Sequence, residues 1–68
     1  MDFIFTKHAR QRMYERKITV EEVKLTVNKG MKWFMESEGE TGRWHAKLGA
    51  VEVVFEREDN YAIIVTVY

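Results

Sequence analysis

Apolar residues change their spacing at Gly30, and this change constrains the fold more than any other feature of the sequence. Before Gly30 they recur with the period of a helix, so that each predicted helix has one apolar face. After Gly30 they alternate with polar residues, as in strands with one buried face. Helices followed by strands predict the α+β class, with two N-terminal helices packed on an antiparallel sheet of three or four strands.

Two helices are predicted before Gly30, over residues 7–16 and 20–29. The first range contains no glycine, proline or β-branched residue, and Thr6 precedes it as an N-cap. The second range follows a capping box that begins at Thr19. Gly30 is expected to end this helix in the left-handed conformation. The inward face of the second helix is predicted to consist of Val20, Val23 and Val27.

The sheet is predicted to begin after Gly30 and to run to the end of the chain. Residues 43–48 alternate cleanly, and Gly49 after them fits a two-residue turn with glycine first. This turn fixes the register, so that the apolar residues of both strands share one face. The predicted pairs are Leu48 with Val51, Ala46 with Val53, Trp44 with Phe55, Lys47 with Glu52 and Arg43 with Glu56. A loop over 38–42, a turn over 58–60 and a strand over 61–68 complete the prediction.

The composition restricts the chemistry and the location of this chain. Sixty-eight residues predict a single domain, over residues 1–68. The sequence has no cysteine, and two histidines without a spaced carboxylate motif do not make a zinc site, so we expect neither a metal nor another cofactor. No apolar run approaches the roughly 18 residues that span a bilayer, and the start Met1-Asp2-Phe3 lacks the basic residues of a signal peptide. A cytoplasmic location without membrane contact is expected.

The net charge of zero hides an uneven distribution. Residues 1–35 hold eight lysines and arginines against four acidic residues, whereas residues 36–68 hold three against seven. The two halves therefore carry net charges of +4 and −4. This asymmetry indicates either a first half that faces a polyanion, or halves that attract each other, or solvated faces.

One stripe of the first helix carries the strongest candidate site. His8, Arg12 and Arg16 are spaced by four residues and line up along the helix, beside its apolar face. An imidazole beside two guanidinium groups suits a phosphate, because arginine holds its oxygens in a bidentate fork while histidine moves a proton. In the structural alternative, the arginines pair with Glu15 or with the acidic half, and His8 bonds to a backbone carbonyl.

His45 lies on the charged face of its predicted strand, either as a second proton-transfer group or as an exposed residue. Trp44 and Phe55 are assigned to the core, because so small a domain needs large side chains there. Trp33 and Tyr14 are candidates for a binding surface.

The opening of the chain resembles a bacterial family of domains of unknown function. Thr6 to Arg16 follows the pattern Ser/Thr-x-His-Ala-x-x-Arg-Met-x-x-Arg of that family, Ile18 to Val23 extends the match, and Thr66-Val67-Tyr68 resembles its last strand. That family is similar to the RelE/ParE-like toxins, small metal-independent endoribonucleases or gyrase poisons with N-terminal helices on an antiparallel sheet. The resemblance implies a RelE/ParE toxin-like fold, RNA as a substrate and an antitoxin protein as a partner.

On this resemblance, His8, Arg12 and Arg16 occupy the signature positions, and Tyr68 belongs to the terminal strand. The expected function is cleavage of an RNA phosphodiester by its own 2′-hydroxyl, with His8 as the base and the two arginines stabilising the phosphorane. Tyr68 or His45 would supply the proton for the leaving oxygen. Two alternatives stay open, a non-catalytic protein-binding module on the same fold and a gyrase-directed toxin.

Overall fold

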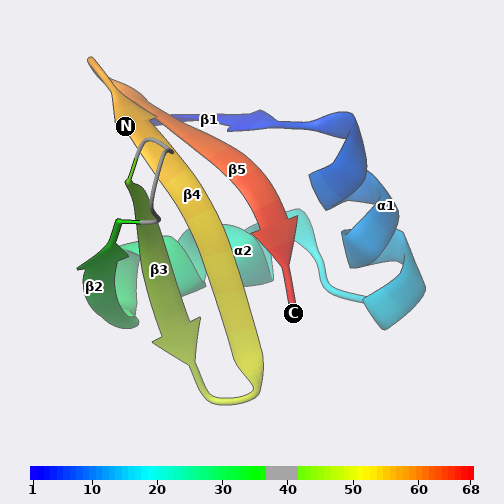
Figure 1. Cartoon of the computed structure of the whole chain (residues 1–68). Coiled ribbons are helices and arrows are strands. Elements are labelled where there is room, and N and C mark those ends of the chain that lie inside the picture. Colours follow the sequence, from blue (N-terminus) through cyan, green and yellow to red (C-terminus); the bar gives the residue numbers. More distant parts are fainter. Residues whose placement is uncertain (37–41) are drawn as a thin grey trace.

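A computed structural model describes residues 1–36 and 42–68, and within these ranges the chain forms two helices and five strands (Figure 1). The elements are β1 (Asp2–Phe5), α1 (Lys7–Arg16), α2 (Val20–Lys29), β2 (Met31–Met35), β3 (Arg43–Leu48), β4 (Val51–Glu58) and β5 (Tyr61–Val67). Of the loop predicted over 38–42, all but Gly42 lies outside the described residues. The described part of the chain contains no helix long and apolar enough to cross a membrane.

The strands form one mixed sheet in the order β1-β5-β4-β3-β2. β1 runs parallel to β5, with Phe3 opposite Ala62 and Phe5 opposite Ile64, whereas the other neighbours are antiparallel. The prediction of a three- to four-stranded antiparallel sheet of the RelE/ParE toxin type is therefore wrong, although the α+β class holds. The error arises from β1, whose four residues precede the first helix and pair with the far end of the chain.

Both helices have the predicted bounds, and their N-caps explain why. Thr6 caps α1 through its hydroxyl, and Thr19 and Glu22 form the complete capping box at α2. The inward face of α2 differs from the prediction at one position, because Val20 is exposed and the buried residues are Val23, Thr26 and Val27.

Gly30 ends α2 in an extended conformation, with φ −73° and ψ 168°, so the predicted left-handed cap is wrong. Glycine is needed there for space: a Cβ atom would lie 2.5 Å from the Thr26 carbonyl oxygen and 2.7 Å from that of Lys47. This close approach brings the end of α2 against β3 as β2 begins. The left-handed residue is instead Lys17 at the end of α1, with φ 57°.

The β3–β4 hairpin has the predicted register. Gly49 has φ +62°, as its turn requires, and Trp44 lies opposite Phe55. On the charged face, the Arg43 guanidinium lies 3.4 Å from the Glu56 carboxylate. Of the two aromatic residues assigned to the core, Phe55 is fully buried. Trp44 is only partly buried, because it packs at the margin of the core against Phe34.

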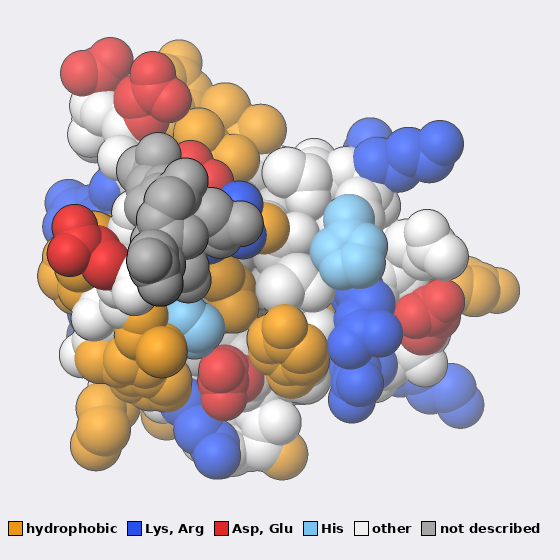
Figure 2. All heavy atoms as spheres, viewed as in Figure 1, with side chains coloured by type: hydrophobic (Ala, Val, Ile, Leu, Met, Phe, Trp, Pro, Cys, Tyr) orange, Lys and Arg blue, Asp and Glu red, His pale blue; other side chains and the backbone are white. Residues whose placement is uncertain are grey.

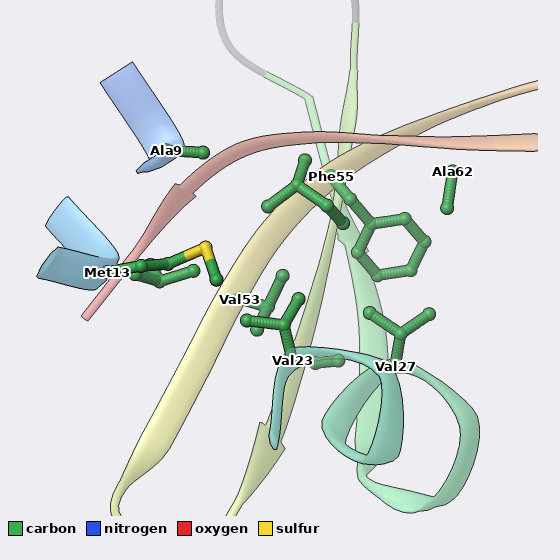
Figure 3. Close-up of a cluster of buried hydrophobic side chains, with 10 residues drawn as sticks. Ala9, Met13, Val23, Val27, Val53, Phe55 and Ala62 are labelled. Atoms are coloured by element: carbon green, nitrogen blue, oxygen red, sulfur yellow. The ribbon is translucent and has the colours of Figure 1, made fainter. Parts of the chain in front are cut away.

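The helices cover one face of the sheet, and α2 lies behind it in Figure 1. α2 packs against β3 and β4, while α1 packs against β5. Figure 3 shows Val23 and Val27 of α2 pointing toward the sheet residues Val53 and Phe55. Among the described residues, the buried cluster consists of Ala9, Met13, Val23, Val27, Ala46, Val53, Phe55, Ala62, Ile64 and Val67.

Candidate functional site

The sheet face away from the helices, called the open face below, carries most of the candidate residues. Alternation along β3 and β4 buries Ala46 and Val53 under the helices and therefore turns His45 and Glu52 to the open face. In Figure 2 this face shows histidine, acidic and basic side chains among hydrophobic ones. β5 has a bulge of one extra residue, because Phe55 of β4 pairs with Ile64 whereas its neighbour Val54 pairs with Thr66.

This bulge decides which residues of β5 reach the open face. Ile64 and Val67 are both fully buried under the helices, although a regular strand would turn residues three apart to opposite faces. As a consequence, Thr66 and Tyr68 point to the open face of the sheet, as His45 does. Without the bulge, the C-terminal tyrosine would point into the core.

His45 is held by two neighbours on the open face. Its ring stacks on Trp33 of β2 at a centroid distance of 5.3 Å and an interplanar angle of 16°. Its Nδ1 atom lies 3.5 Å from a carboxylate oxygen of Glu52, and both side chains are partly buried. When Nδ1–H faces the carboxylate, Nε2 is the free nitrogen that can exchange a proton with a ligand.

Glu52 also connects this pair to the end of the chain. Its backbone accepts a hydrogen bond from the Tyr68 amide at 2.7 Å and donates one to the Tyr68 carbonyl at 3.2 Å. The Arg12 guanidinium of α1 stacks over the Tyr68 ring, 5.6 Å from its centroid. Arg12, Tyr68, Glu52 and His45 therefore form a continuous group across the open face, called the open-face site below.

α1 reaches this site because β1 ends early. The Thr6 hydroxyl donates to the carbonyls of Ile64 and Val65, at 2.9 Å and 3.1 Å, just where β1 leaves β5. The helix that follows runs beside the unpaired end of β5, with Ala9 and Met13 buried against the core. Arg12 stands next to Met13 and extends to the open face.

Two polar atoms near this site have no partner within the described residues. Arg12 Nε and the Thr66 hydroxyl oxygen are both buried and make no hydrogen bond. Thr66 precedes Tyr68 by two residues on the same face of the strand, and Arg12 stacks over the Tyr68 ring, so both atoms belong to residues that neighbour Tyr68. Such groups are rare in folded proteins and call for an explanation.

Of the five residues singled out in the sequence, Tyr68 and His45 lie on the open face, and Arg12 stacks on Tyr68. His8 and Arg16 are exposed on α1, and no hydrogen bond or ion pair among the described residues joins them to the other three. The sequence interpretation missed Glu52 as the partner of His45. The signal was present, because the predicted hairpin register places Glu52 diagonally across from His45.

Two further features of the described residues bear on metal and phosphate chemistry. In residues 1–36 and 42–68, no three side chains of a metal-ligating type are grouped so as to hold a metal ion. An open pocket of about 250 Å³ lies at the β4–β5 turn, lined by Ile4, Glu58, Asp59, Tyr61 and Ile63. Its only charged residues are acidic, so it does not suit a phosphate.

These features define a small α+β domain whose open sheet face carries a histidine–carboxylate pair beside a stacked arginine and tyrosine. Residues 5–68 match a family described as a domain of unknown function, DUF4258. The chain belongs to this family, as the resemblance to a domain-of-unknown-function family predicted, while the similarity to RelE/ParE-like toxins stays a prediction. No curated protein and no solved structure matches the chain.

Proposed function

We propose that this domain is a metal-independent endoribonuclease that cleaves RNA phosphodiesters, with the activity expected of a RelE/ParE-like toxin. The observation that supports this function is the open-face site, where His45, oriented by Glu52, lies on the same face as Tyr68 and the Arg12 guanidinium. Cleavage by the substrate's own 2′-hydroxyl needs a base, an acid and a cation for the phosphorane, and these side chains supply all three.

In the proposed reaction, His45 Nε2 removes the proton of the 2′-hydroxyl, and the 2′-oxygen attacks the adjacent phosphorus. The bond from phosphorus to the 5′-oxygen breaks, and the Tyr68 hydroxyl gives that oxygen a proton. The products are a 2′,3′-cyclic phosphate and a 5′-hydroxyl end. A water-mediated return of the proton from His45 to Tyr68 restores both groups. Arg12 stabilises the extra negative charge of the phosphorane through its guanidinium.

The spacing of the strands supports these roles. β3 and β5 flank β4, and His45 lies opposite Val54 whereas Tyr68 lies opposite Glu52, so their backbones are two strand spacings apart across the sheet and two residues apart along it, about 12 Å in all. Side chains that extend toward each other over β4 can contact opposite sides of one phosphate. His45 has an orienting carboxylate and His8 has none within the described residues, which favours His45 as the base. We assign His8 and Arg16 to the binding of a neighbouring phosphate in the same RNA molecule.

Arg12→Lys tests this proposal. Lysine keeps the charge but not the bidentate fork, so kcat/KM for a single-stranded RNA should fall about 10- to 100-fold, whereas the melting temperature should stay near that of the parent. Cleavage by purified protein, with and without a chelator, measures the effect. Arg10→Lys, an exposed position of the same helix, is the matched control and should cleave normally. Cleavage that is lost with chelator, or that Arg12→Lys leaves intact, would contradict the proposal.

A protein-binding module is the second candidate, because β2 is an exposed apolar edge strand. Met31, Phe34 and Met35 are 76%, 50% and 52% exposed. β2 contains no proline, and such an edge strand can pair with a strand of another protein. A segment that binds there would add a sixth strand to the sheet.

Growth arrest upon expression separates the two candidates. If the domain acts by binding a protein through β2, Met35→Lys should abolish the arrest, because it places a charge on the apolar edge, and Arg12→Lys should leave the arrest unchanged. An endoribonuclease predicts the reverse order of effects. The fraction of folded protein, measured by circular dichroism for both variants, is the control.

A further inference from the structure

Thr66 is the most buried polar group on the open face that makes no hydrogen bond. It lies on β5, next to the central strand of the sheet, the residue is 8% exposed, and its hydroxyl has no hydrogen-bond partner among residues 1–36 and 42–68. A buried hydroxyl without a partner costs about 1–3 kcal/mol, so valine, which has the same shape, would be the more stable residue in a purely structural role. The presence of threonine points to a ligand.

Thr26 shows what a buried threonine with a structural role does in this domain. It is 1% exposed, and its hydroxyl donates to the Glu22 carbonyl at 2.7 Å within α2. Both threonines are buried, but only the hydroxyl of Thr66 makes no hydrogen bond among the described residues. They form a matched pair for experiment.

Arg12, which stacks over the Tyr68 ring two residues from Thr66, has the second buried polar atom without a partner among the described residues. Its Nε is buried without a partner, and the guanidinium is held by the Tyr68 ring, with no ion pair or hydrogen bond among the described residues. A hydroxyl and a guanidinium Nε–H both donate hydrogen bonds, and the ligand that accepts from both and neutralises the arginine is an anion with several oxygens. Phosphate has this chemistry.

We propose that the Thr66 hydroxyl binds the same phosphate as Arg12 and thereby positions it, an inference that rests on the proposed endoribonuclease function. Thr66 donates to one non-bridging oxygen, and the Arg12 guanidinium donates to the others. Because both orphaned atoms are covered, the Arg12 side chain and the half-exposed Tyr68 ring must separate when the phosphate enters. Loss of one cation–π contact is a small cost beside two charge-assisted hydrogen bonds.

The test measures binding without cleavage. The probes are inorganic phosphate and a 2′-deoxy dinucleotide, which has the phosphodiester but lacks the attacking hydroxyl, each titrated against the full chain and followed by NMR. Thr66→Val should weaken binding of the dinucleotide about tenfold or more and leave the melting temperature unchanged or higher. Thr66→Ser, which restores the hydroxyl, should bind within about threefold of the parent. Thr26→Val should do the opposite of Thr66→Val, with a lower melting temperature and unchanged binding.

Three outcomes would overturn the inference. The first is that the parent binds neither probe, and the second is that Thr66→Val binds the dinucleotide as tightly as the parent does. The third is a lower melting temperature for Thr66→Val, which would mean that the hydroxyl has a hydrogen-bond partner within the protein. Equal binding by Thr66→Val together with RNA cleavage by the parent would leave the endoribonuclease function standing. Binding that depends on Thr66, in a parent protein that leaves RNA intact, would support the phosphate subsite and refute the endoribonuclease.

Discussion

Phe55→Ala is expected to leave the domain largely unfolded at 25 °C. Phe55 is 1% exposed on β4, the central strand of the sheet, between Trp44 and Ile64 on the neighbouring strands. Truncation of such a side chain removes its burial and leaves a cavity, at a cost of about 3–5 kcal/mol. A core of this size rarely supplies more than about 3–5 kcal/mol in total. Thermal unfolding followed by circular dichroism should show no cooperative transition.

Phe34→Ala is the matched control for this effect. Phe34 is 50% exposed on the edge strand β2, where its ring contacts Trp44. The same truncation there should cost about 1 kcal/mol and lower the melting temperature by about 4–8 °C. A cooperative transition of Phe55→Ala at or above that of Phe34→Ala would show that the core is not centred on β4.

His45→Ala is expected to have the largest effect on activity. Loss of a general base reduces the rate by about 10²- to 10⁴-fold, and the partly exposed position of His45 should spare the fold. The measurement is single-turnover cleavage of RNA by the purified variant. Glu52→Gln removes the charge that orients the ring while its backbone pair with Tyr68 stays, so it should also reduce the rate, at unchanged affinity for the 2′-deoxy dinucleotide.

His8→Ala distinguishes this assignment from the one expected from the sequence. His8 lies one helical turn before Arg12 and is exposed, so its loss should weaken RNA binding without abolishing the chemical step. If His8→Ala lowers the rate of RNA cleavage more than His45→Ala does, the base is His8 and not His45. Equal rates for the parent and both variants would refute a histidine base altogether.

The helices and the hairpin could be predicted because the residues that end and begin them act locally. The hydroxyls of Thr6 and Thr19 each accept a hydrogen bond from an amide three residues later, and Gly49 sets its turn through its own φ of +62°. The register of β3 and β4 follows from the turn, and it places His45 and Glu52 on one face. These signals span at most a dozen residues, so no tertiary information is needed to interpret them.

β1 could not be found in this way. Its four residues carry only a short alternation, with Phe3 and Phe5 partly buried and Ile4 exposed. Its partner is β5, which follows it in the sequence only after two helices and three strands. Since a strand this short is stable only with its neighbour, the evidence for it lies in the pairing and not in its own residues.

The sequence by itself determined which side chains share a face: His8, Arg12 and Arg16 on one stripe of α1, and His45 with Glu52 on one side of the hairpin. The repeat of about 3.6 residues in a helix and of 2 residues in a strand is a property of the local backbone, so a sequence pattern reveals it. Only the tertiary structure decided that Arg12 meets Tyr68 and that Thr66 is buried beside them. Those contacts depend on the parallel pairing of β1, which carries α1 to the end of β5, and on the bulge that turns Tyr68 outward. Both are set by packing between residues far apart in the chain, which no local pattern encodes.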